Sequence, residues 1–114
     1  MSDQARWIER GLLTILSEPD GTAYLVTVSG EMDGSTAREL EDELLRLERG
    51  GPSEIVLDVS RLAFIDSTGL AVIVRADRRM RRGGHSLTLV RPQGKQVGRA
   101  FELSGLDQAL SFVA

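Results

Sequence analysis

The residues of this chain best suited to chemistry are Asp66, Ser67 and Thr68, which stand together just before Gly69. They place a carboxylate and two hydroxyls where a loop is predicted to turn into a helix. Ser, Thr and Asp are preferred N-cap residues, so helix capping is one interpretation of the segment. A hydroxyl at a helix start is also exposed and close to free backbone N–H groups that tolerate a phosphate. Phosphorylation is therefore a second, compatible interpretation.

Common catalytic signatures are missing from the sequence. A P-loop ending at Gly94-Lys95 would need glycine at position 89, which is leucine. A nucleophile elbow would need glycine two residues before Ser67, where Ile65 stands. The single histidine, His85, lies in a predicted turn, and the chain has no cysteine. We therefore predict a protein that is not an enzyme and that has no cofactor and no metal site.

Length and charge limit the function classes further. The chain has 114 residues, the size of one domain, and a formal net charge of −3. This charge argues against direct binding of nucleic acid driven by overall charge. No apolar run approaches the roughly 18 residues that a membrane span needs, and residues 1–11 lack the apolar core of a signal peptide. We expect a cytoplasmic protein with no membrane span that is a monomer when free.

The elements that must position the candidate residues follow from hydrophobic periodicity. Strands are predicted at residues 12–16, 24–29, 55–59 and 86–90, and helices at about 37–47, 67–82 and 97–110. The first helix has capping-box spacing at Thr36 and Glu39, and a short loop through Phe64 and Ile65 leads into the second helix. The order predicts an α/β fold, with a mixed sheet of four to five strands and helices mainly on one face.

Charged residues follow helical spacing on the first two predicted helices. Four arginines form a stripe on the helix that begins at Ser67: Arg75, Arg78, Arg79 and Arg82. The stripe fits either a solvated face or a surface that docks an acidic partner, with Arg75 nearest Ser67. Five acidic residues of the preceding helix are predicted to keep that helix soluble: Glu39, Glu41, Asp42, Glu43 and Glu48.

Several short segments occur together in the order and at the spacing of a known family. They are Gly30-Glu31-Met32-Asp33, Leu57-Asp58-Val59-Ser60, the run from Phe64 to Leu70, Gly83-Gly84, and the run from Phe101 to Leu106. The first resembles the turn, and the third the phosphorylation segment, of STAS-domain anti-anti-sigma factors, also called anti-sigma factor antagonists. The resemblance covers about Leu12 to the C-terminus. We therefore predict a STAS domain over residues 12–114, and a lead-in over residues 1–11 with Trp7 packed on the domain edge.

The resemblance implies a switch. In that family the unphosphorylated protein binds an anti-sigma factor that is also a serine kinase, which frees a sigma factor. The kinase then phosphorylates the serine after the motif's aspartate, here Ser67, and the complex separates until a serine phosphatase restores the binding form. By resemblance, Asp33 should lie near Ser67. The predicted partner-binding residues are Asp33, Ser35, Asp66, Thr68, Gly69 and Arg75.

Two questions remain open at this level. Thr68 is an alternative to Ser67 as the modified residue. STAS domains also occur as subunits of signalling scaffolds and lipid-transport complexes, so such a subunit is the alternative function. The intact Asp66-Ser67-Thr68-Gly69 segment favours the regulated switch.

Overall fold

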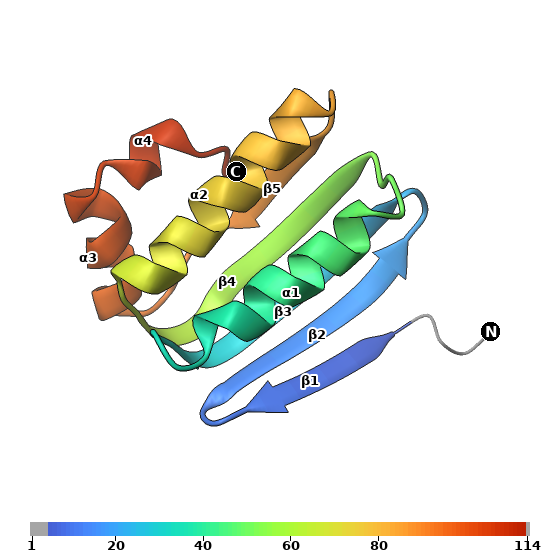
Figure 1. The fold of residues 1–114 in the computed structure, drawn as a ribbon. Coiled ribbons are helices and arrows are strands. Elements are labelled where there is room, and N and C mark those ends of the chain that lie inside the picture. Colours follow the sequence, from blue (N-terminus) through green and yellow to red (C-terminus); the bar gives the residue numbers. More distant parts are fainter. Residues whose placement is uncertain (1–4, 114) are drawn as a thin grey trace.

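The computed structural model describes residues 5–113, which form a five-stranded sheet with helices packed on it (Figure 1). The strands stand in the sheet in chain order: β1 (Arg6–Arg10), β2 (Leu13–Asp20), β3 (Ala23–Met32), β4 (Glu54–Ile65) and β5 (Ser86–Val90). β2 runs antiparallel to both of its neighbours, whereas β3, β4 and β5 are parallel. The predicted α/β fold with a mixed sheet is confirmed.

The helices in this described part of the chain are α1 (Ala37–Glu48), α2 (Ser67–Arg82), α3 (Lys95–Leu103) and α4 (Leu106–Ala109). Each of α1 and α2 connects two parallel neighbouring strands, and Figure 1 shows them side by side on one face of the sheet. α3 packs against β4 and α4. None of the helices within residues 5–113 is long and apolar enough to cross a membrane.

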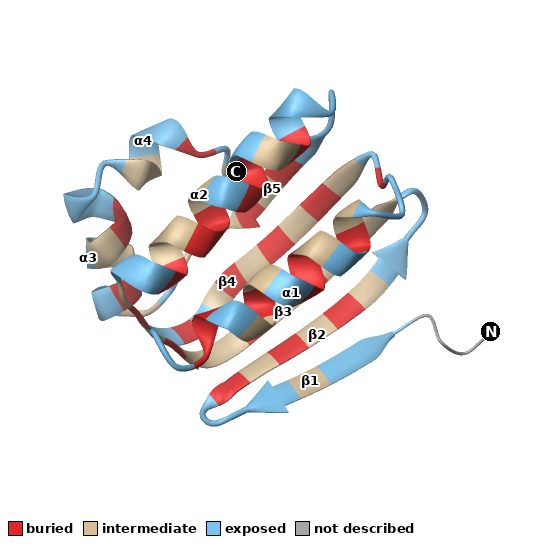
Figure 2. Ribbon diagram, in the orientation of Figure 1, coloured by how far each residue is buried: buried red, intermediate tan, exposed pale blue. Residues whose placement is uncertain are grey.

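The core lies between α1, α2 and one face of the sheet. Every second residue of the central strands is buried, as Val26 and Val28 are in β3 and Leu57 and Val59 are in β4. The residues between them are only half-buried, which produces the alternation of red and tan along the strands in Figure 2. Because successive strand residues point to opposite faces, this pattern means that the helices cover mainly one face.

Residues 6–10, which the sequence analysis places in a lead-in, form the edge strand β1. They pair with β2 from Arg6 opposite Ser17 to Arg10 opposite Leu13. Ile8 is half-buried and packs against the core. Trp7 is 61% exposed, so the predicted packing of Trp7 on the domain edge is wrong. Trp7 lies on the opposite side of the strand from Ile8, away from the helices.

Three local predictions also differ from the structure. β4 continues through Phe64 to Ile65, where a loop is predicted, because it stays paired with β3 to the last residue of that strand. α1 begins after Thr36, but the capping box does not form: the Thr36 hydroxyl donates to the carbonyl of Glu31 at 3.0 Å instead. Gly105, with φ of 78°, divides the predicted last helical region into α3 and α4.

Candidate functional site

The candidate site lies where the parallel strands β3 and β4 end side by side. Because the carboxyl ends of parallel strands share one edge of the sheet, the loops that follow them meet there. The backbone N–H of Asp66 donates to the carbonyl of Met32 at 3.2 Å. Gly34 faces the start of α2, since a Cβ placed on it would stand 3.9 Å from Thr68 Oγ1. The loop after β3 is thus next to the N-terminus of α2.

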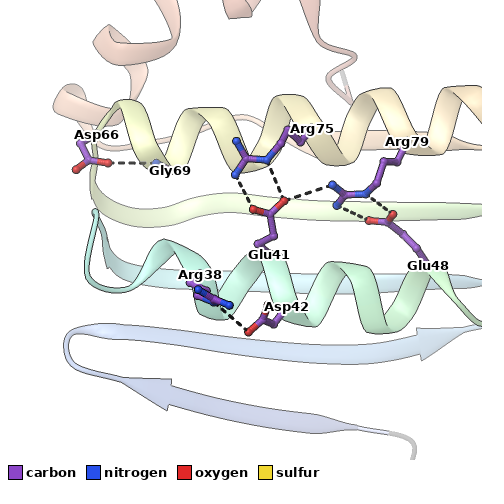
Figure 3. Close-up of polar contacts among 8 residues, drawn as sticks. All are labelled: Arg38, Glu41, Asp42, Glu48, Asp66, Gly69, Arg75 and Arg79. Atoms are coloured by element: carbon purple, nitrogen blue, oxygen red, sulfur yellow. Dashed lines mark hydrogen bonds and ion pairs between the residues drawn. The ribbon is translucent and has the colours of Figure 1, made fainter.

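Asp66 is the N-cap of α2. Its backbone is extended, and its Oδ1 accepts a hydrogen bond from the backbone N–H of Thr68 at 3.0 Å. The same oxygen accepts from the backbone N–H of Gly69 at 3.1 Å (Figure 3). These bonds satisfy two of the donors that a helix start leaves free. Ser67 is the first residue of the helix and is exposed. Its hydroxyl makes no hydrogen bond to any residue between 5 and 113.

Asp33 organises the loop between β3 and α1. Its Oδ1 accepts hydrogen bonds from the backbone N–H of Ser35 at 2.9 Å and from the Ser35 hydroxyl at 2.7 Å. These bonds hold the pKa of the Asp33 carboxyl below its ordinary value, so the group is a carboxylate at neutral pH. Asp33 and Ser35 therefore shape one loop of the site, and Ser67 stands at the start of the neighbouring helix.

Gly69 allows the close packing of α2 against the ends of β3 and β4. A Cβ at this position would lie 2.7 Å from Cγ1 of Ile65 and 3.0 Å from Cγ of Met32, both of which are buried. Gly69 is itself buried. Close packing therefore accounts for glycine at this position, and a contact of Gly69 with a partner stays a prediction.

Gln96 of α3 supports the same junction and is not indicated by the sequence analysis. Its side-chain amide donates to the carbonyl of Ile65 and accepts from the N–H of Ile65, both at 2.9 Å. The backbone just before Asp66 is thus held from a second side. The sequence carries no local signal for this contact, because it joins residues 31 positions apart.

The arginine stripe on α2 is divided between two roles. Arg75 bonds to Glu41 of α1, and Arg79 bonds to both Glu41 and Glu48, which links the two helices (Figure 3). The sequence analysis did not predict these bridges, and the docking role of Arg75, which is still exposed, stays a prediction. Arg78 is exposed and forms no ion pair within the described residues.

The acidic residues of α1 also differ from the prediction that they only keep the helix soluble. Glu41 and Glu48 are engaged by α2, and the side chain of Glu43 is 1% exposed and bound by Arg46 and Ser17. Hydrogen bonds from Arg75 lower the pKa of the Glu41 carboxyl, although its partial burial opposes this. Complementary charges on two successive helices were the signal that could have predicted these bridges.

Ser67 and Thr68 face different grooves. Thr68 lines a groove of about 360 Å³ between α1 and α2, together with Gly34 and Arg75. Ser67 lines a groove on the outer side of α2. The two candidate hydroxyls are therefore neighbours in sequence but belong to different surfaces.

Comparison with known proteins identifies the family. The family model described as "Mlab, STAS domain" matches residues 17–113. The anti-sigma-B factor antagonist of Staphylococcus aureus is 31% identical over 87 residues, which cover 76% of this chain and 80% of that protein. The chain belongs to the STAS-domain family of anti-sigma factor antagonists. The resemblance predicted from the sequence segments is thereby confirmed.

Solved structures agree with this STAS assignment. An anti-sigma factor antagonist from Mycobacterium paratuberculosis matches with a TM-score of 0.79 and 28% identity, over 88% of this chain and 84% of that one. The antagonist SpoIIAA in its unphosphorylated form matches with a TM-score of 0.74 and 20% identity, over 88% of both chains. At that identity SpoIIAA supports the fold alone. The roles of individual site residues in this STAS domain remain predictions.

Proposed function

We propose that this STAS domain is a phosphorylation-controlled anti-sigma factor antagonist. Its unphosphorylated form binds an anti-sigma factor serine kinase and so frees a sigma factor. Phosphorylation of Ser67 ends the binding, and a serine phosphatase restores it. The observation that carries the proposal is made at the start of α2. There Asp66 caps the helix, and the neighbouring Ser67 is left exposed.

Charge explains how the phosphate would act as an off-switch. A phosphate adds about −1.5 to −2 charge and three acceptor oxygens. At Ser67 this charge stands next to the Asp66 carboxylate, on the surface that the proposal assigns to the partner. Burying the phosphate against a partner costs free energy through like-charge repulsion and through desolvation that nothing compensates. Each 1.4 kcal/mol of binding free energy lost lowers the affinity about tenfold.

The fold should tolerate the modification. The N-terminus of a helix carries partial positive charge and stabilises a nearby anion. The Bacillus protein SpoIIAA has been solved in a phosphorylated form, and that structure matches this chain with a TM-score of 0.63. A phosphate is therefore compatible with a STAS fold, and the switch would act on binding rather than on folding.

The test is a binding titration of the purified chain against the anti-sigma factor serine kinases of the source organism. We expect Ser67→Asp to reduce affinity at least tenfold, with a melting temperature close to that of the wild type. Ser67→Ala should bind like the wild type and should block phosphate incorporation by the kinase, whereas Thr68→Ala should still be phosphorylated. Incorporation is located by mass spectrometry of the digested product.

Two results would contradict the proposal. A large fall in the melting temperature of Ser67→Asp would make Ser67 a structural residue of the helix start. The other result is that wild type and Ser67→Asp capture the same scaffold or lipid-transport subunits equally well and bind no kinase. The domain would then be a constitutive subunit of an assembly.

A further inference from the structure

The outer side of α2 carries a shallow, open apolar groove that begins at Ser67. The groove has a volume of about 390 Å³, and α4 contributes its other wall. Its apolar lining consists of Leu70, Ala71 and Val74 of α2 and Leu106 of α4. Figure 1 shows α4 beside α2, on the side away from α1. This groove is separate from the α1–α2 groove that Thr68 lines.

α2 has more apolar surface than the core uses. Its inward side is buried, with Val72, Ile73 and Ala76 at most 1% exposed. Leu70 and Val74 are spaced i and i+4 and are only half-buried. Leu70 packs partly against the core, as Leu106 of α4 does, and all three keep part of their apolar surface exposed. Arg78 continues this line by one further turn. The helix therefore presents a second, outward stripe of two apolar residues followed by a cation.

The charge at the end of this stripe is available for a partner. Arg75, which also borders the groove, is held by Glu41 on α1. Arg78 is exposed and has no ion-pair partner between residues 5 and 113. An acidic group bound beside Val74 would therefore meet an uncompensated guanidinium, which is the side chain best suited to a carboxylate.

The walls of the groove restrict the kind of segment that fits. α2 is a helix, so its interior backbone N–H and C=O groups bond within it and cannot pair with an added strand. Recognition must then occur through side chains, as when an amphipathic helix lays its apolar face into a groove. We propose that this groove binds an amphipathic helix of the anti-sigma factor, with apolar residues over Leu70, Val74 and Leu106 and an Asp or Glu at Arg78.

This inference rests on the proposed function and explains how Ser67 would control it. Ser67 forms part of the groove wall at the N-terminal end of α2. A phosphate there would place a strongly hydrated anion against the apolar face of the docked helix. Its desolvation would oppose docking even where no acidic residue of the partner is nearby.

The first test compares two groove variants with a control variant in the same kinase titration. We expect Val74→Gln to weaken binding at least tenfold and Arg78→Glu to slow association and reduce its salt dependence. Leu16→Gln is the matched control, because Leu16 is also half-buried but lies on the sheet face away from α1 and α2. It should bind like the wild type, and all three variants should keep the wild-type far-ultraviolet circular dichroism.

The outcomes separate the two proposals. If Ser67→Asp abolishes binding while Val74→Gln and Arg78→Glu bind like the wild type, the switch stands and the groove is overturned. If the wild type binds none of the kinases, the proposed function fails and the groove inference fails with it.

The second test identifies the segment of the kinase that binds in the groove. A photo-crosslinking residue placed at position 74 should capture one peptide of the kinase, and mass spectrometry identifies that peptide. We expect a helical segment with apolar residues at i, i+3 or i+4 spacing and a carboxylate nearby. A basic or uniformly polar peptide, or a crosslink that forms equally well with phosphorylated Ser67, would overturn the inference.

Discussion

At the start of α2, two adjacent polar residues have different tasks. The Asp66 carboxylate accepts from two backbone N–H groups, whereas Ser67 makes no hydrogen bond within the described residues. From sequence alone, capping and phosphorylation both fitted this segment, because Asp and Ser are equally good N-cap residues. The structure assigns the cap to Asp66, which leaves the Ser67 hydroxyl exposed to solvent.

This division predicts different stabilities for two alanine variants. Asp66→Ala should lower the free energy of unfolding by about 0.5–2 kcal/mol, because it removes an N-cap side chain. Ser67→Ala should change it by no more than about 0.5 kcal/mol, as expected for an exposed side chain without partners. Urea denaturation followed by circular dichroism measures both. Equal losses would show that Ser67 also contributes to the cap.

At the scale of helices and strands, the order of most elements could be predicted because their apolar residues recur with clear periods. β1 was missed because it is short and mostly exposed, so Arg6–Arg10 shows little hydrophobic pattern. The contact of Gln96 with Ile65 and the bridges between α1 and α2 were missed for another reason. The Gln96 contact depends on which elements become neighbours in space, and local sequence does not contain that information. For the bridges, the complementary charges on the two helices were visible in the sequence, but the packing of those helices side by side was not.

The bridges between α1 and α2 should contribute measurably to stability. Arg79 is only 25% exposed in its side chain and bonds to Glu48 at 2.7 and 3.0 Å. We expect Arg79→Met to lower the free energy of unfolding by about 1–2 kcal/mol. Hydrogen bonds between charged, partly buried groups contribute more to stability than surface ion pairs do. Arg78→Met is the matched control and should change it by less than about 0.5 kcal/mol. Equal effects would mean that the bridges add no stability.

The same bridges should make stability depend on pH. The Arg75 hydrogen bonds lower the pKa of Glu41 in the folded state. A carboxyl whose pKa is lower in the folded state than in the unfolded state adds to the stability of the fold. This added stability is fully present at pH values above the pKa of the unfolded state, and it is lost as pH falls through the pKa of the folded state. The stability difference between the wild type and Arg75→Met should therefore be constant near neutral pH and shrink as Glu41 becomes protonated in acid. A difference that persists at pH 2 would point to packing of the Arg75 side chain instead.

On the scale of the whole molecule, Glu43 connects three parts of the fold. Its carboxylate accepts from Ser17 of β2 at 2.7 Å and from Arg46 of α1 at 2.8 and 2.9 Å, and it pairs with Arg6 of β1 at 3.1 Å. Burial raises the pKa of the Glu43 carboxyl, but the hydrogen bonds from Arg46 and Ser17 outweigh this, so the pKa lies below its ordinary value. The edge strand is therefore held to the domain by a buried charge as well as by its pairing with β2.

Glu43→Gln should loosen β1 before it affects the rest of the sheet. The change removes the charge that Arg6 and Arg46 share, and it should lower the free energy of unfolding by about 1–3 kcal/mol at neutral pH. Hydrogen exchange should accelerate most at the backbone amides of residues 6–10. Glu39→Gln is the control, because Glu39 is half-buried and meets the exposed Arg10 only at 3.8 Å, so the pair should contribute little. If the amides of β1 exchange at the wild-type rate in Glu43→Gln, the ladder with β2 alone holds the strand, and Glu43 serves only to connect α1 to β2.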